Sequence, residues 1–215
     1  KIIVNNQGHV NSINFTYCNS PTERLRLCEI RMKNKVNADY EKYTFEYNRN
    51  LSEPEYLANQ NDHWGFWNGV TTDVPMHISI VAALKNLKVP VFENTQFNIL
   101  KKVVYPGGGY STFEYEQNKV SKSIMADGYD LSLIGNSNVG GLRLKRTMDY
   151  DYNDKLANEK TFIYLNEFEN NFSESMINES PSSGILNSSI DYLWQQSSSK
   201  VVNQSPVNLQ SFVSG

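Results

Sequence analysis

The feature that most constrains this chain is the stretch at residues 99–116, Ile-Leu-Lys-Lys-Val-Val-Tyr-Pro-Gly-Gly-Gly-Tyr-Ser-Thr-Phe-Glu-Tyr-Glu. Two runs of strand-forming residues flank Pro106 and three consecutive glycines. Proline has no N–H to donate to a ladder, and glycine accepts the positive φ that tight turns require. After the turn, successive side chains alternate between the two faces of a strand. The stretch therefore predicts a β-hairpin.

Similar strand pairs are found on both sides of this hairpin. An alternating basic and aliphatic run at 24–27 precedes a strand-like run at 43–47, and another at 142–145 precedes 161–164. Each second run contains Thr-Phe-x-Tyr, as the central hairpin does. Such alternation is typical of a sheet with one buried and one wet face. The spacing leaves open whether these three pairs are a true repeat or a chance similarity in a Tyr-rich β protein.

The rest of the chain predicts more strands and one short helix. Strand-like runs flank a turn signal at 5–8, and two more strands are expected near the C-terminal end. Apolar residues at helical spacing predict a short helix within 77–88, ended by Pro90. The predicted fold class is all-β, a large twisted sheet or a sandwich of antiparallel hairpins with one short helix.

Between these elements the sequence predicts irregular connections. Residues 119–131 are polar and indicate a loop or a weak strand, and the glycines of 134–141 indicate a turn. A strand is expected at 160–168, followed by an Asn- and Ser-rich loop. Residues 1–215 are expected to form a single β-rich domain or a fragment of a longer repeat protein, with 170–215 loosely ordered.

Composition narrows the functional classes. The chain has 215 residues, a formal net charge of −3 and only 20% charged residues, so it lacks the basic footprint of a nucleic-acid-binding protein. No apolar run approaches the roughly 20 residues that span a membrane. The abundance of Asn, Ser and Tyr fits a secreted or surface β protein. The ends of the sequence suggest a piece of a longer chain.

Cys18 and Cys28 are the two cysteines of the chain. They would form a disulfide if the strand ending at Tyr17 paired with the strand starting at Leu27. The alternative is a pair of free thiols, one on each strand, and this is the reading that we favour from sequence. Two cysteines alone do not predict a metal site.

The most enzyme-like feature is the adjacent pair Asp62 and His63. A general base needs an imidazole that is oriented by a carboxylate, but neighbouring residues on a strand point to opposite faces. The chain has no nucleophile elbow and no zinc-protease motif. The sequence therefore predicts no catalytic residue, no metal site and no cofactor.

The densest aromatic segment offers a second kind of site. Trp64, Phe66 and Trp67 would form a platform for a sugar ring or a peptide, with Asn68 supplying hydrogen bonds at its rim. The alternative, which we favour, is that Trp64 and Phe66 plug the end of a sheet while Gly65 and Gly69 let the loop fold back. The four candidate ligand-binding residues are Trp64, Phe66, Trp67 and Asn68.

Three aspartates, Asp149, Asp151 and Asp154, resemble part of an oxygen-ligand set for Ca²⁺. The stretch lacks the glycine and the terminal glutamate of an EF-hand loop. A solvated strand edge is the interpretation that we favour. The basic residues of 100–102 and 142–146 are expected on the wet face, opposite Glu114 and Glu116.

Three stretches in this order, 62–69, 100–116 and 139–146, resemble the region that precedes the RHS/YD-type repeats in large surface or secreted proteins of Bacteroides-like bacteria. Here the turn reads Pro-Gly-Gly-Gly where that region would have Pro-Thr-Gly-Gly. The resemblance implies a β-rich, non-catalytic scaffold at the cell surface or outside the cell. Its partners would be neighbouring repeats of the same full-length chain. The alternative function is a carbohydrate- or peptide-binding module that uses residues 64–67 to hold a surface glycan or protein.

Overall fold

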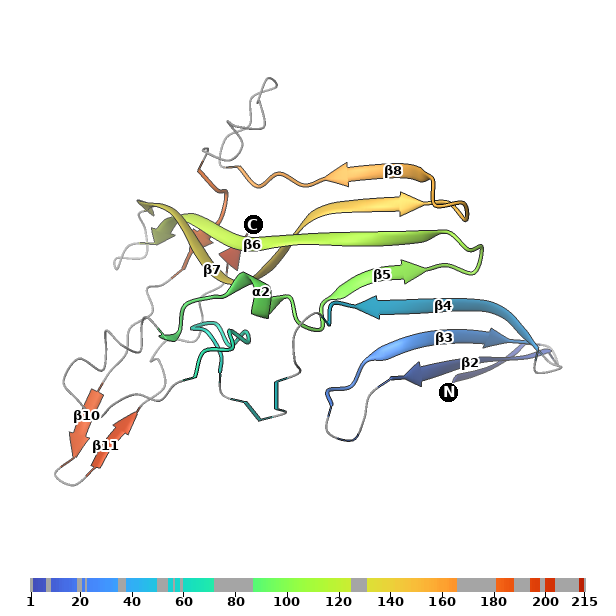
Figure 1. The fold of residues 1–215 in the computed structure, drawn as a ribbon, viewed down its shortest axis with the longest axis horizontal. Helices are drawn as coiled ribbons and strands as arrows, with labels where there is room; N and C mark the ends of the chain where they lie inside the picture. The colour runs from blue at the N-terminus through green and yellow to red at the C-terminus, as the bar shows by residue number, and fades with distance from the viewer. Residues whose placement is uncertain are drawn as a thin grey trace, which may run out of the picture. The chain divides into compact units, whose positions relative to one another are not determined.

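The described residues form mostly antiparallel β structure with little helix, which confirms the predicted all-β class (Figure 1). The computed structural model describes residues 2–6, 9–18, 21, 23–34, 38–49, 54–55, 57–58, 60–71, 87–124, 131–165, 181–187, 194–197, 200–203 and 213–214. The chain divides into two compact units. Unit 1 comprises Lys1–Ala58, Gln96–Tyr115 and Leu144–Thr161, and unit 2 comprises Asn59–Thr95, Glu116–Arg143 and Phe162–Gly215.

Unit 1 is a meander in which strands that follow one another in sequence lie next to one another in the sheet (Figure 1). Most neighbours are joined by short connections, as antiparallel pairs allow, whereas the connection from β4 to β5 includes Asn59–Thr95 of unit 2. The strands are β1 (Ile2–Asn6), β2 (His9–Tyr17), β3 (Leu27–Lys33), β4 (Asp39–Tyr47), β5 (Leu100–Val104), the first part of β6 (Tyr110–Ile124), the last part of β7 (Leu131–Tyr150) and β8 (Leu156–Thr161).

The central hairpin forms as predicted between β5 and β6. The turn closes through hydrogen bonds from Tyr105 N to Gly109 O and from Gly108 N to Tyr105 O, each 2.9 Å long. Gly108 has a φ of +87°, a conformation that side chains with a Cβ rarely adopt. The glycine run therefore fixes the turn, and the turn fixes the pairing of Val103 with Ser111.

The strand register places the large apolar side chains of unit 1 on one face. Phe15 pairs with Ile30, Ile30 with Tyr43, and Phe45 with Val103, and directly paired residues share a face of the sheet. We call this surface the apolar face; it comprises Ile13, Phe15, Ile30, Met32, Tyr43, Phe45, Val103 and Phe113. Of these eight side chains only Val103 is buried, and the other seven are half-buried.

The opposite face of unit 1 carries charged and polar side chains. Arg146 on β7 contacts Glu114 on β6 at 2.8 Å and Glu159 on β8 at 3.0 Å. Lys102 on β5 lies 3.7 Å from a carboxylate oxygen of Glu46 on β4. These pairs confirm the predicted wet-face position for Lys102 and Arg146, whereas their sequence neighbours Lys101 and Lys145 alternate to the other face.

Unit 2 contains the remaining parts of β6 and β7 and several short elements. The helix α2 (Phe92–Thr95) follows Pro90, and β9 (Ile185–Leu186) pairs in parallel with β6. β12 (Val213–Ser214) pairs with β9, while β10 (Trp194–Ser197) and β11 (Lys200–Asn203) form a separate antiparallel pair. Val120 on β6 and Val139 on β7 are 0% and 2% exposed, so they mark the core of this unit.

Of the loop or weak strand expected at 119–131, residues 119–124 form the end of strand β6, and residues 125–130 lie outside the described residues. Two other predicted boundaries were wrong. The glycines of 134–141 lie within the continuous strand β7 instead of forming a turn, and Gly135 and Gly141 take positive φ values there, as glycine can at an irregular point of a strand. The strand expected at 160–168 is β8, which ends at Thr161. Most of the helix predicted within 77–88 lies outside the described residues.

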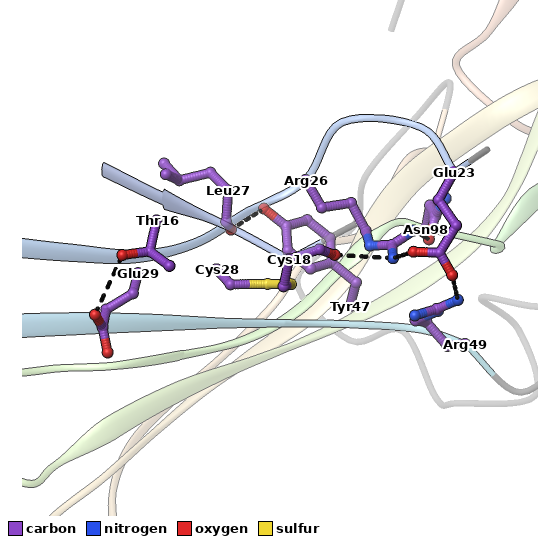
Figure 2. The surroundings of a disulfide bond; sticks show 10 residues. All are labelled: Thr16, Cys18, Glu23, Arg26, Leu27, Cys28, Glu29, Tyr47, Arg49 and Asn98. Carbon is purple, nitrogen blue, oxygen red and sulfur yellow. Dashed lines mark hydrogen bonds and ion pairs between the residues drawn. A yellow bond between two sulfur atoms is a disulfide. The ribbon is translucent and has the colours of Figure 1, made fainter. Parts of the chain in front are cut away.

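The cysteines form a disulfide, so the reading as free thiols was wrong (Figure 2). Tyr17 pairs with Leu27, and the register shifts at this point, which leaves Cys28 as an extra residue in β3. The Cα atoms of Cys18 and Cys28 are 5.7 Å apart, a normal separation for a disulfide.

Within the described part of the chain, no helix is long and apolar enough to cross a membrane.

Candidate functional site

The aromatic segment of unit 2 folds into a tight loop that we call the aromatic loop, residues 61–67. Asn61 and Trp67 pair across its base, and Asp62 N donates to Phe66 O at 2.8 Å. Gly65 closes the turn with a φ of +90°, where a side chain would be strained. The loop therefore turns back on itself, as the sequence predicted for this glycine.

Asp62 organises the backbone of the aromatic loop. Its Oδ1 accepts hydrogen bonds from the backbone N–H groups of Trp64 and Phe66, both at 2.9 Å. The side chain is 3% exposed, and its Oδ2 has no hydrogen-bond partner. Burial raises the pKa of Asp62, while the backbone donors act in the opposite direction. The carboxylate thus binds main-chain amides instead of orienting the imidazole of His63.

His63 lies beside the aromatic rings of the loop. Its ring meets that of Trp64 edge to face, with ring centres 5.6 Å apart. Its backbone N–H donates to Lys88 O at 2.9 Å, which ties the loop to the segment before α2. The charges of Asp62 and Lys88 attract each other. Burial lowers the pKa of Lys88, because it disfavours the charged ammonium group.

The aromatic loop packs on two consecutive glycines of β7. A Cβ on Gly140 would lie 2.6 Å from Trp64 Cβ, and one on Gly141 would lie 2.9 Å from Phe66 Cζ. Both distances are shorter than carbon atoms tolerate, so the rings approach the strand only because side chains are missing there. Trp64 and Phe66 therefore pack against the sheet of unit 2.

The side-chain amide of Asn68 is hydrogen-bonded to backbone groups of the protein. Its Nδ2 donates to Leu87 O at 2.9 Å and to Val89 O at 3.0 Å, while its Oδ1 accepts from Val70 N at 3.1 Å. The residue is 1% exposed. Both amide hydrogens already have acceptors, so Asn68 ties the chain just after the aromatic loop to residues 87–89.

The four candidate ligand-binding residues differ in their access to solvent. Phe66 is 43% exposed, Trp64 and Trp67 are half-buried, and Asn68 is buried. The exposed part of Phe66 is a small apolar surface on which a ring could stack. Trp64, Phe66 and Trp67 thus lie in the aromatic loop, whereas Asn68 lies just after it and is buried.

Two of the three aspartates considered for Ca²⁺, Asp149 and Asp151, accept hydrogen bonds from other residues of the chain. Asp149 accepts from Ser111 Oγ at 2.5 Å and from Asn158 Nδ2 at 3.0 Å. Asp151 accepts from the backbone N–H groups of two later residues and so builds the turn after β7. Among the residues that the structure describes, no group of three His, Cys, Asp or Glu side chains could hold a metal ion.

Sequence reasoning missed the two glycines that receive the aromatic loop. It also missed Gln117 on β6, which is 7% exposed and holds the β7 backbone beside these glycines through hydrogen bonds from its Nε2 to Val139 O at 2.5 Å and to Gly141 O at 3.1 Å. The consecutive glycines 140–141 were a usable signal, because glycine inside a strand often marks a close approach of another segment.

No protein-family model, no curated protein and no solved structure matches this chain.

Proposed function

We propose that this chain is a non-enzymatic structural module of a large bacterial cell-surface or secreted protein. Its apolar face would be covered by neighbouring repeats of the same full-length chain. The observation that carries the proposal is the half-exposed state of that face, where Phe15, Ile30 and Phe45 lie on adjacent strands. A sheet needs a second layer on its apolar face to form a complete core.

Two other features support a role outside the cytoplasm as a scaffold. The disulfide between Cys18 and Cys28 is of a kind that persists in oxidising environments. The acidic and amide side chains of the candidate sites bind backbone or neighbouring side chains, as Asp62 and Asn68 do. These side chains hold loops in place, as we expect in a structural module.

The test compares this chain with a longer one that includes the sequence following it. We expect the 215-residue chain to bind the apolar dye anilinonaphthalene sulfonate, and Phe45→Ser to reduce the binding because it removes a ring from the apolar face. Glu46→Gln is the matched control, since Glu46 is the next residue and points to the opposite face. Dye binding should fall in the longer chain.

Two results would contradict the proposal. Equal dye binding by the wild type, Phe45→Ser and Glu46→Gln would mean that the apolar face is not what the dye detects. Undiminished binding by the longer chain would mean that the following sequence does not cover the face.

A second candidate function is the binding of a glycan or peptide by the aromatic loop, supported by the exposed ring of Phe66. It predicts that oligosaccharides change the tryptophan fluorescence and that Phe66→Ala abolishes this change without loss of stability. Phe162→Ala is a control, because Phe162 is similarly exposed at 38%. Acrylamide quenching of Trp64→Phe and Trp67→Phe variants separates the alternatives, since shielded indoles and destabilised variants indicate a packing role.

A further inference from the structure

The disulfide lies where the pairing of β2 with β3 ends (Figure 2). The last pair of that ladder is Tyr17 with Leu27, and one further backbone bond joins Cys18 N to Arg26 O at 3.2 Å. The crosslink closes a ring of chain from Cys18 to Cys28, which we call the disulfide ring. The ladder itself runs along β2 and β3 without needing the crosslink.

A buried arginine sits inside the disulfide ring. Arg26 is 4% exposed, and its Nη2 donates to Cys18 O at 3.0 Å and to Glu23 Oε2 at 2.7 Å. Glu23 also contacts Arg49 at 3.0 Å. A buried guanidinium is tolerated only where its hydrogens find acceptors, so the position of the Cys18 carbonyl matters to Arg26.

Arg26 also reaches out of the ring to the connection that precedes β5. Its Nη1 donates to Asn98 Oδ1 at 3.4 Å (Figure 2). Asn98 has a φ of 61°, and its backbone N–H donates to Asn48 O at 2.8 Å, while Asn48 N donates to Ile99 O at 2.9 Å. An asparagine in the left-handed region is held there by such bonds. Arg26 therefore links the disulfide ring to the end of β4 and the start of β5.

The disulfide is accessible to a thiol reagent, because Cys18 is exposed and Cys28 is half-buried. A dithiol reductant can attack one sulfur as a thiolate and release the other cysteine as a thiolate, which then takes up a proton. The second thiol of the reductant then attacks the mixed disulfide and frees the remaining cysteine. The protein gains two electrons and two protons, and the reductant becomes a cyclic disulfide.

We propose that the disulfide is a reducible lock on the Arg26 anchor. In the oxidised chain the ring holds the Cys18 carbonyl against the guanidinium, and Arg26 holds Asn98. In the reduced chain the ring relaxes, Arg26 loses this fixed acceptor, and the connection at Asn98 loosens while the β4–β5 ladder stays paired. The lock thus lets a redox change alter the junction between the end of β4 and the start of β5 without unfolding the sheet, and it does not depend on the proposed scaffold function.

The test is hydrogen–deuterium exchange of the oxidised protein and of the protein kept in dithiothreitol. We expect the Asn98 amide to exchange at least about tenfold faster after reduction, because its hydrogen bond opens locally. The amide of Val103, in the paired part of β5, should not change. Reoxidation should restore slow exchange at Asn98.

Two variants separate the anchor from the crosslink. Arg26→Met in the oxidised protein should speed exchange at Asn98 although the disulfide is intact, whereas Leu25→Ala should not, since Leu25 is 71% exposed. An unchanged Asn98 amide after reduction overturns the proposal. Equal acceleration at Val103 and Asn98 also overturns it, because reduction would then unfold the sheet as a whole.

Discussion

Replacing Gly140 with alanine probes the contact between the aromatic loop and β7. The added Cβ would lie 2.6 Å from Trp64 Cβ and 2.8 Å from Asp62 Oδ2. Trp64 Cβ is fixed to the backbone and cannot rotate away, so the loop has to move by about 1 Å to reach normal carbon–carbon contact. We expect the free energy of unfolding to fall by about 1–3 kcal/mol, the usual penalty for overpacking a closely packed site.

The assay is urea unfolding followed by circular dichroism and by tryptophan emission. Because the added Cβ displaces the loop from the strand, the Trp64 side chain becomes more exposed to solvent. The tryptophan emission of the folded Gly140→Ala protein should therefore shift to longer wavelength. Gly107→Ala is the matched control, since its Cβ would meet nothing within 4 Å and Gly107 does not take a positive φ. We expect no loss of stability there.

The reasoning is refuted if Gly140→Ala is as stable as Gly107→Ala and keeps the wild-type emission spectrum. That result would mean that the aromatic loop does not rest on the glycines of β7 in solution. A loss of stability without a change in emission would also count against it, because the strain would then lie elsewhere.

Three other predictions concern charge and the crosslink. Burial raises the pKa of Asp62 above its ordinary value of 3.8, so the folded chain binds this proton more tightly and the contribution of Asp62 to stability falls as pH rises through the folded pKa. Asp62→Asn should remove that fall from the pH profile of urea unfolding, and an identical profile would show the carboxylate to be solvated. Arg146→Met breaks the ion pairs to Glu114 and Glu159, both partly exposed, so its small effect on the melting temperature should vanish in high salt; an effect that persists would indicate lost packing. Replacing Cys18 and Cys28 with serine should lower the free energy of unfolding by about 3 kcal/mol, the chain-entropy value for a ring of this length, and a loss near zero in the same denaturation assay would contradict this.

The strands were predictable because they depend on local sequence. Alternating side chains mark strands, and the run of proline and glycines at 106–109 marks a tight turn. The pairing of basic with acidic residues on one face followed from the same alternation, and Arg146 meets Glu114 as expected. The candidate site was also found locally, since its aromatic residues are neighbours in the sequence.

Strand ends and glycines within strands were less predictable. The polar residues that end β6 suggested a loop or a weak strand, yet Ser121 is 1% exposed and its Oγ donates to Ser182 O at 2.6 Å. A polar residue is placed in a core when a distant carbonyl meets it there, and a local pattern contains no information on such a partner. The glycines of β7 suggested a turn. Gly140 and Gly141 are instead required by the close approach of a loop that is far away in sequence.

The sequence by itself determined the class of fold, the central hairpin and the alternation that divides the sheet of unit 1 into an apolar and a charged face. The tertiary structure decided that the two cysteines form a disulfide, because a one-residue shift in the β2–β3 register brings Cys28 to Cys18. It also decided that Asp62 builds a loop instead of orienting His63, since the carboxylate is directed by the backbone amides around it. Local propensity sets where a strand forms, whereas register and packing depend on residues brought together only when the chain folds.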